Sequence, residues 1–333
     1  MTVTWILILV ASLAILVKSA DWLVESAEKI ALAFNVSPFI VGVSVVALGT
    51  SLPEVATTVT AVLKGTTEFV VDTAFGSNIA TILLIIGVAA IVGKKLKVTR
   101  SLVNLDAPLL SVSTVLITFM VFDRKVTFWE GIILMIGFLI YVFYTFFQRH
   151  PMEKDEEELE TLPSRAERRK TKTTQKMTTN MKEKIGFKTF LFLIVGIIGL
   201  AIGSNYAVES VTQLGRILSI NASFLAITAI AVGTSLPELA VSVKAAMNKK
   251  YEIALGNVFG SNVFTIFLVI GLPALIKPLA VNEVTFVIGV PYLIAATFLF
   301  VISGISKKIH IWEGLMYLLI FILFVVQFFS FSI

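Results

Sequence analysis

The chain contains no cysteine, and only two of its 333 residues are histidine. Disulfide bonds and thiolate metal centres are therefore excluded. His150 and His310 fall near the ends of predicted helices, so a transition-metal site is not favoured either. Charge is also scarce, because only 15% of the residues are charged, whereas soluble proteins average about 25%. With 57% hydrophobic residues, the composition predicts a polytopic membrane protein.

Long apolar stretches recur along the whole chain. A helix needs about 20 mostly apolar residues to cross a bilayer, and ten stretches approach this length. The predicted fold is therefore all-α, with ten transmembrane helices. Their approximate bounds are 3–32, 36–63, 68–93, 101–122, 127–147, 188–217, 222–247, 251–276, 283–303 and 311–331. The first and sixth are longer than the minimum, which favours a tilt or an extension beyond the bilayer. No basic segment precedes the first span, so we expect it to be retained.

The basic residues are distributed unevenly among the predicted loops. Eleven of the 27 lie within 148–188 beside eight acidic residues, and four more lie within 94–100. Placing both segments in the cytoplasm leaves few basic residues on the other side, as the positive-inside rule describes. We therefore expect both termini to lie outside. This asymmetry accounts for the net charge of +5, and nucleic acid is not an expected partner.

Several sequence motifs occur twice at a nearly constant separation. "GTSLPE" at 49–54 recurs unchanged at 233–238, an offset of 184 residues, and "FGSNIATILLIIG" at 75–87 recurs as "FGSNVFTIFLVIG" at 259–271. The shorter motifs "VES" and "WEG" recur at offsets of 184 and 183. Each copy contains five spans, and because five is odd the second copy enters the membrane from the opposite side. We predict a first repeat over 1–147, a charged cytoplasmic linker over 148–187 and an inverted second repeat over 188–333. Transporters built in this way bind their substrate near the midplane, between the repeats.

The repeated "GTSLPE" motif places a proline and a carboxylate inside a membrane span. Pro53 has no amide proton and its ring clashes with the carbonyl of Gly49, and Pro237 and Gly233 repeat the arrangement. We expect both helices to open there and to expose carbonyl oxygens to a cavity.

The hydroxyl and carboxylate groups of the motif share one helical face. Thr50, Ser51 and Glu54 have this spacing, as do Thr234, Ser235 and Glu238. Ser77 and Thr81 share a face of the companion helix, and Ser261 and Thr265 repeat them. Packed together, these groups would form an all-oxygen site with two carboxylates, which suits Ca²⁺. The hydroxyls and carbonyls also suit Na⁺, and no cofactor is expected.

At these motifs the sequence resembles the Na⁺/Ca²⁺ exchanger family of the cation/Ca²⁺ antiporter superfamily, over almost all of the chain outside 148–187. The resemblance implies that Glu54 and Glu238 are central Ca²⁺ ligands, with backbone carbonyls from Thr50 and Thr234. It implies flanking Na⁺ or shared positions at Ala47, Ser51, Ser77, Thr81, Ala231, Ser235, Ser261 and Thr265. The long first and sixth helices would slide over the other eight. The resemblance and the charge asymmetry together imply a multi-pass protein of the plasma (inner) membrane, and we expect one chain to suffice for transport.

Two features depart from the family pattern. Thr81 and Thr265 stand where members usually carry asparagine or aspartate, and Asp72-Thr73 stands where the second repeat has Gly256-Asn257. Four further polar residues are candidates for an ion-linked or proton-linked role: Asp72, Asn78, Asn262 and Asp106. Asp72 is equally consistent with an interfacial position at a helix start, and both asparagines with interhelical hydrogen bonds.

The leading hypothesis is therefore exchange of Na⁺ for Ca²⁺ by alternating access. The alternative is H⁺/Ca²⁺ exchange, or exchange of another cation (K⁺ included), through the same glutamate pair. A channel fits less well, because channels usually line a pore with rings from several subunits. An enzyme is not expected, because the two glutamates have identical sequence settings and nothing separates an acid from a base.

Overall fold

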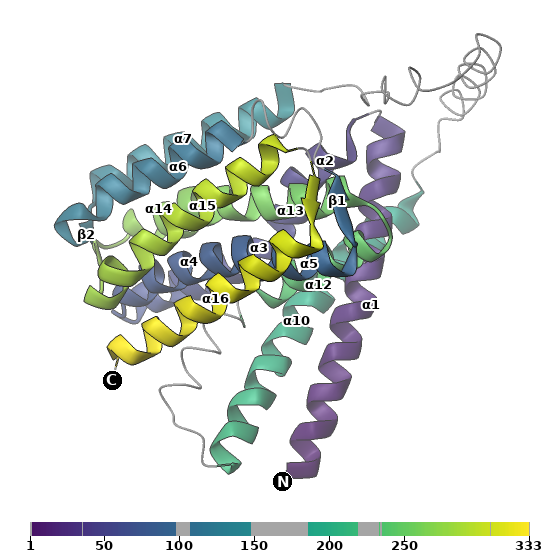
Figure 1. The fold of residues 1–333 in the computed structure, drawn as a ribbon, viewed down its shortest axis with the longest axis horizontal. Helices are drawn as coiled ribbons and strands as arrows, with labels where there is room; N and C mark the ends of the chain where they lie inside the picture. Colours follow the sequence, from purple (N-terminus) through teal and green to yellow (C-terminus); the bar gives the residue numbers. More distant parts are fainter. Residues whose placement is uncertain are drawn as a thin grey trace.

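A computed structural model describes residues 2–34, 36–97, 107–147, 186–218, 233, 235–306 and 308–332. Nearly all of these residues are helical (Figure 1). In the first half, the helices are α1 (Thr2–Phe34), α2 (Pro38–Val41), η1 (Gly42–Val46), α3 (Ala47–Leu63), α4 (Glu68–Ala80), η2 (Thr81–Ile85), α5 (Ile86–Val92), α6 (Ala107–Met120), η4 (Val121–Asp123) and α7 (Phe128–Phe147). In the second half, they are α10 (Phe187–Ile217), α12 (Leu236–Met247), α13 (Tyr251–Phe264), η5 (Thr265–Ile270), α14 (Gly271–Ala274), η6 (Thr285–Gly289), α15 (Val290–Ile305) and α16 (Ile311–Ser332).

Eight helical spans in the described residues are long and apolar enough to cross a membrane. They correspond to eight of the ten predicted spans. The fourth predicted span is described as the shorter apolar helix Ala107–Asp123, and the seventh only from α12 onward. The described helices are consistent with ten spans. Parts of the fourth and seventh predicted spans, and most of the predicted linker 148–187, lie outside the described residues.

Several spans are composed of α-helical and π-helical segments joined end to end. Wider π turns occupy η1, η2, η5 and η6, and the flanking residues keep right-handed helical dihedral angles. π turns of this kind are often found at functional sites. The η2 and η5 segments begin at Thr81 and Thr265, the two predicted site residues of the companion helices.

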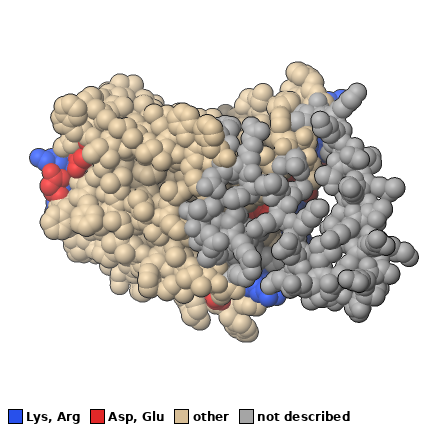
Figure 2. All heavy atoms as spheres, turned by 90° about the horizontal axis from the view of Figure 1, so that it is seen from above, with Lys and Arg blue, Asp and Glu red and all other residues tan. Residues whose placement is uncertain are grey.

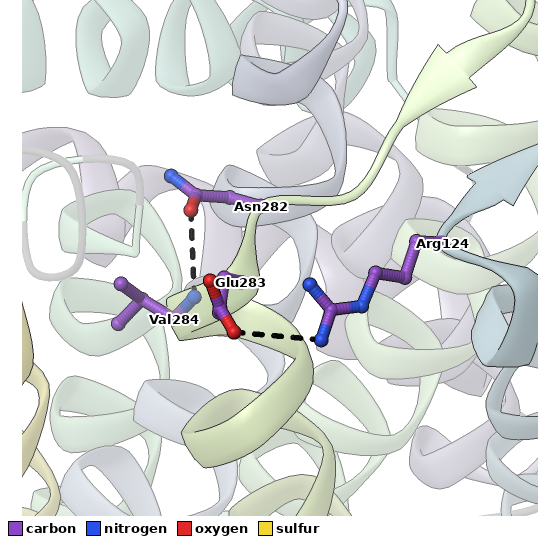
Figure 3. A network of polar contacts seen from close by, with 4 residues as sticks. All are labelled: Arg124, Asn282, Glu283 and Val284. Carbon is purple, nitrogen blue, oxygen red and sulfur yellow. Dashed lines mark hydrogen bonds and ion pairs between the residues drawn. The ribbon is translucent and has the colours of Figure 1, made fainter.

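Short strand pairs, which the sequence did not predict, join the two halves at loops. The strand β1 (Lys95–Lys97) pairs antiparallel with β4 (Lys308–His310), and β2 (Lys125–Val126) pairs with β3 (Leu279–Ala280). Next to the second pair, Arg124 Nη2 lies 3.6 Å from Glu283 Oε1 (Figure 3). The Arg124 guanidinium also covers the ring of Phe286. Runs of two or three residues carry too little alternation for a strand to be recognised from sequence.

The two longest helices lie side by side at one edge of the molecule, where α1 and α10 extend beyond the rest of the bundle (Figure 1). Their close approach is permitted by glycines on α10, such as Gly196 and Gly203, which face backbone atoms of α1. The most deeply buried span is Tyr251–Ala274, which lies at the centre of the core. On the face seen in Figure 2, the described residues are mostly uncharged and the charged side chains lie mainly at the edges, as expected for a lipid-facing belt.

Candidate functional site

The two "GTSLPE" segments meet at the centre of the protein beside the companion helices. Glu54 lies on α3 and Glu238 at the start of α12, with exposed fractions of 3% and 1%. Ser77 on α4 and Thr265 at the start of η5 are equally buried. Residues more than 150 positions apart in the chain are therefore brought together, as the inverted repeat requires.

Glu54 is held by one hydroxyl from each repeat. Ser77 Oγ donates a hydrogen bond of 2.6 Å to Glu54 Oε1, and Thr265 Oγ1 donates one of 3.2 Å to Oε2. The Ser77 hydroxyl is also 3.2 Å from Ser235 Oγ. Four of the predicted site residues thus form one continuous network across the repeat interface.

Glu238 has a different environment, although its local sequence is the same. Neither of its carboxylate oxygens has a hydrogen-bond partner among the described residues, and both are buried. The hydroxyls of Ser51 on α3 and Ser261 on α13 are likewise buried and have no hydrogen-bond partner among the described residues. Buried polar atoms usually have partners, so this group of oxygens is suited to a ligand. The expectation that the two glutamates have equivalent settings is therefore wrong, because their surroundings depend on helix placement.

Asn257 connects the two repeats around the site. Thr50 Oγ1 lies 3.3 Å from Asn257 Oδ1, while Asn257 Nδ2 donates to the carbonyl of Glu238 at 3.3 Å and to Ser242 Oγ at 3.0 Å. The corresponding position in the first repeat is Thr73, whose shorter side chain has no such partner among the described residues. Asn257 stood out in the sequence only as part of the Gly-Asn pair of the second repeat. The feature of the sequence that could have identified it is an amide side chain within an apolar span.

The first motif does not open its helix as predicted. α3 continues through Pro53, and the irregular turns lie earlier, in η1. The second motif agrees better, since α12 begins only at Leu236, with Pro237 in its first turn. There the carbonyl of Gly233 accepts a 2.9 Å hydrogen bond from Ser204 of α10, so it is not available to a cavity in this conformation.

The remaining predicted residues lie around this centre or outside the described residues. Thr81 is buried at the start of η2, and the carbonyl of Ala47 accepts from Thr50 Oγ1 at 3.1 Å. Asn78 Nδ2 donates to the carbonyl of Asn262 at 3.3 Å, and this pair joins equivalent positions of the two repeats. Ala231, Thr234 and Asp106 lie outside the described residues.

Asp72 is separate from the central network. Its Oδ1 accepts a hydrogen bond of 2.5 Å from Thr285 at the start of η6. Asp72 precedes Ser77 by five residues, which is about 7.5 Å along a helix axis. The structure therefore places this carboxylate at the η6 contact and not among the central hydroxyls.

No basic side chain among the described buried residues balances the two glutamates of the centre. The buried polar side chains of the described residues include two glutamates but no lysine, arginine or histidine. Burying a carboxylate without a counter-charge is costly, so two such groups are neutralised either by protons or by bound cations. One divalent ion or two monovalent ions would neutralise them, and the surrounding oxygens are the ligand type that hard cations prefer.

Comparison with known proteins agrees with this chemistry. A family model described as sodium/calcium exchanger protein matches residues 4–147 and 188–330. The chain belongs to the sodium/calcium exchanger family. The family is one of membrane antiporters, and the chain is accordingly a multi-pass membrane protein.

Individual members of the family are similar over most of the chain. The sodium/calcium exchanger MaX1 of Methanosarcina acetivorans is 32% identical over 321 residues, covering 88% of this chain and 89% of that protein. The inner membrane protein YrbG of Escherichia coli is 32% identical over 247 residues, with 74% and 71% covered. The solved structure of the sodium-calcium exchanger NCX_Mj soaked with 2.5 mM Na⁺ and 0.1 mM Sr²⁺ superimposes with a TM-score of 0.80 at 26% identity, covering 98% and 99% of the two chains.

Proposed function

We propose that this protein exchanges Na⁺ for Ca²⁺ across the membrane at the buried two-glutamate centre. The observation that supports the proposal most strongly is the pair of buried carboxylates, Glu54 and Glu238, surrounded by hydroxyls and without a basic side chain among the described buried residues. A Ca²⁺ ion replaces water with oxygen ligands and is neutralised by two carboxylates. Two of the similar proteins are themselves named as sodium–calcium exchangers.

In this proposal the ligands divide between the two ions. Glu54 and Glu238 bind Ca²⁺ with the backbone carbonyls of Thr50 and Thr234. Na⁺ uses the surrounding hydroxyls and carbonyls, at Ala47, Ser51, Ser77, Thr81, Ala231, Ser235, Ser261 and Thr265. Because both ions need the same carboxylates for neutralisation, they compete, and competition at one site is sufficient for exchange.

Alternating access follows from the arrangement of the helices. The long helices α1 and α10 form a unit beside the core, and α10 crosses both motifs. Ile197 of α10 lies against Gly49, and Val208 lies against Gly233. A Cβ atom at either glycine would come within 2.7 Å of these side chains, so the motif glycines allow close contact with the moving unit. Movement of α1 and α10 would expose the centre to each side in turn, in a plasma (inner) membrane with both termini outside and 148–187 in the cytoplasm.

Neutralising either glutamate tests the site assignment. Glu54→Gln and Glu238→Gln should each abolish Na⁺-driven Ca²⁺ uptake in proteoliposomes while the purified protein remains monodisperse. Removing one unit charge about 4 Å from a divalent ion costs at least ~4 kcal/mol at intermediate dielectric, roughly 10³-fold in affinity. The control is Glu25→Gln, an exposed glutamate of α1, which should transport like the wild type. Full uptake by both site variants would refute the assignment.

H⁺/Ca²⁺ exchange is a second candidate because of Asp72. This carboxylate lies within a membrane span and is hydrogen-bonded to Thr285. Ionisable groups in membrane spans often belong to proton relays. Ca²⁺ flux that follows a pH gradient in the absence of sodium, and that is lost in Asp72→Asn, would support this candidate over Na⁺ coupling.

A further inference from the structure

Two ion pairs fasten α1 to the core at one end of the molecule. Lys244 Nζ lies 2.9 Å from Asp21 Oδ1, and Lys250 Nζ lies 2.6 Å from Glu28 Oε2. Asp21 and Glu28 are seven residues apart, so they share one face of α1. The side chains of the first pair are 24% and 23% exposed, so this pair is partly shielded from solvent. In the second pair Lys250 is 19% exposed and Glu28 42% exposed, so only its lysine is shielded.

Apolar packing accompanies the ion pairs. Ile30 and Ala31 of α1 belong to one buried cluster with Val241 and Ala245 of α12. α1 therefore packs against this face of α12 together with neighbouring helices, and both Val241 and Ala245 are 0% exposed.

Among the described residues, the equivalent face of the first repeat is open. An open groove of about 450 Å³ lies there, and all of its lining residues come from 56–69. The offset of 184 residues maps Val241, Lys244, Ala245 and Lys250 onto four of them: Thr57, Thr60, Ala61 and Thr66. The face that α1 covers in one repeat is thus the face that is hollow in the other.

The ion pairs have no counterpart in the first repeat. Lys244 and Lys250 correspond to Thr60 and Thr66, and Asp21 and Glu28 correspond to Asn205 and Thr212 of α10. If α10 moved into the groove, as the pseudo-symmetry of alternating access requires, it would form the same apolar contact without either ion pair.

We propose that Asp21–Lys244 and Glu28–Lys250 form a one-sided ionic latch. The latch holds α1 against α12 and favours the present conformation over the pseudo-symmetric one, in which α10 fills the groove. It rests on the proposed alternating access. The four residues are positioning residues, because none of them is part of the glutamate network, and they set which side of the centre is open when no substrate biases the equilibrium.

The absence of cysteine from the chain provides a direct test. Thr57→Cys and Val241→Cys are reporters at equivalent positions, one exposed in the groove and one buried below α1. Each is labelled with a maleimide in the purified, cation-free protein, with and without Lys244→Gln and Lys250→Gln. Partly exposed ion pairs contribute about 0.2–1 kcal/mol each, so loss of both should shift the conformational equilibrium by about 2- to 30-fold. Labelling of Val241→Cys should rise by this factor, and labelling of Thr57→Cys should fall.

Matched variants separate the latch from a loss of charge or of structure. Lys249→Gln removes the same charge from an exposed neighbour and should leave both rates unchanged. Exchanging the charges, with Asp21→Lys and Lys244→Asp together in the Lys250→Gln protein, should restore part of the wild-type ratio. Unchanged reporters, or reporters that both become faster, would overturn the latch. Na⁺-driven Ca²⁺ uptake by the wild type is measured separately, so its failure would count against the proposed function and not against the labelling result.

Discussion

The unequal settings of the two glutamates predict unequal effects of the same substitution on stability. Glu54 accepts hydrogen bonds from Ser77 and Thr265, and its replacement by glutamine leaves one acceptor oxygen for two hydroxyls. A hydrogen bond to a charged group contributes about 1.5–3 kcal/mol, so Glu54→Gln should lose roughly that amount. The carboxylate oxygens of Glu238 have no such partners among the described residues, so Glu238→Gln loses no comparable hydrogen bond.

The assay is thermal unfolding of the purified protein with a chelator present. Both substitutions remove the same repulsion between the carboxylates, so the difference between the variants isolates the hydrogen bonds. This difference is about 1.5–3 kcal/mol, and at about 2–4 °C per kcal/mol the Tm of Glu238→Gln should exceed that of Glu54→Gln by roughly 3–12 °C. Glu25→Gln, on the exposed face of α1, should remain near the wild type. Equal Tm values for the two site variants, or the reverse order, would refute the described asymmetry.

Three further predictions concern single positions. Ser77→Ala removes the 2.6 Å hydrogen bond to the first glutamate, so Ca²⁺ titrations followed by thermal shift should show affinity about 10-fold weaker, and unchanged affinity would exclude that serine from the site. Gly256→Ala adds a Cβ atom 2.5 Å from a backbone oxygen of α2 and should destabilise the protein by about 1–3 kcal/mol in denaturant unfolding. The control Gly186→Ala adds a Cβ atom that meets nothing within 4 Å and should not destabilise the protein. Asp72→Asn should retain Na⁺-driven Ca²⁺ uptake, because its carboxylate contacts Thr285 outside the central network, and loss of this uptake would show that Asp72 takes part in the Na⁺-coupled cycle.

The sequence predicted the spans and the meeting of the motifs, because both depend on patterns that survive in any helical arrangement. Apolar length determines a span, and an exact repeat of "GTSLPE" requires that both copies have similar neighbours. The network of Glu54, Ser77, Ser235 and Thr265 follows from this symmetry.

The sequence could not predict where the symmetry fails. Thr265 donates a hydrogen bond to Glu54, but the carboxylate oxygens of Glu238 have no partner among the described residues. This difference depends on small shifts in the relative positions of the helices. Proline chemistry predicted an open helix in both motifs, yet α3 continues through Pro53, since a helix can tolerate a missing donor where neighbouring helices support it. The ion pairs on α1 join charges more than 200 residues apart and carry no sequence periodicity.

Ca²⁺ uptake into proteoliposomes under an outward Na⁺ gradient, compared with a matched pH gradient, tests the central claim most directly. The proposed exchange predicts Ca²⁺ uptake driven by sodium alone, abolished by Glu54→Gln and by Glu238→Gln. Uptake that follows only the pH gradient, with no response to sodium, would contradict Na⁺ coupling at the two-glutamate centre.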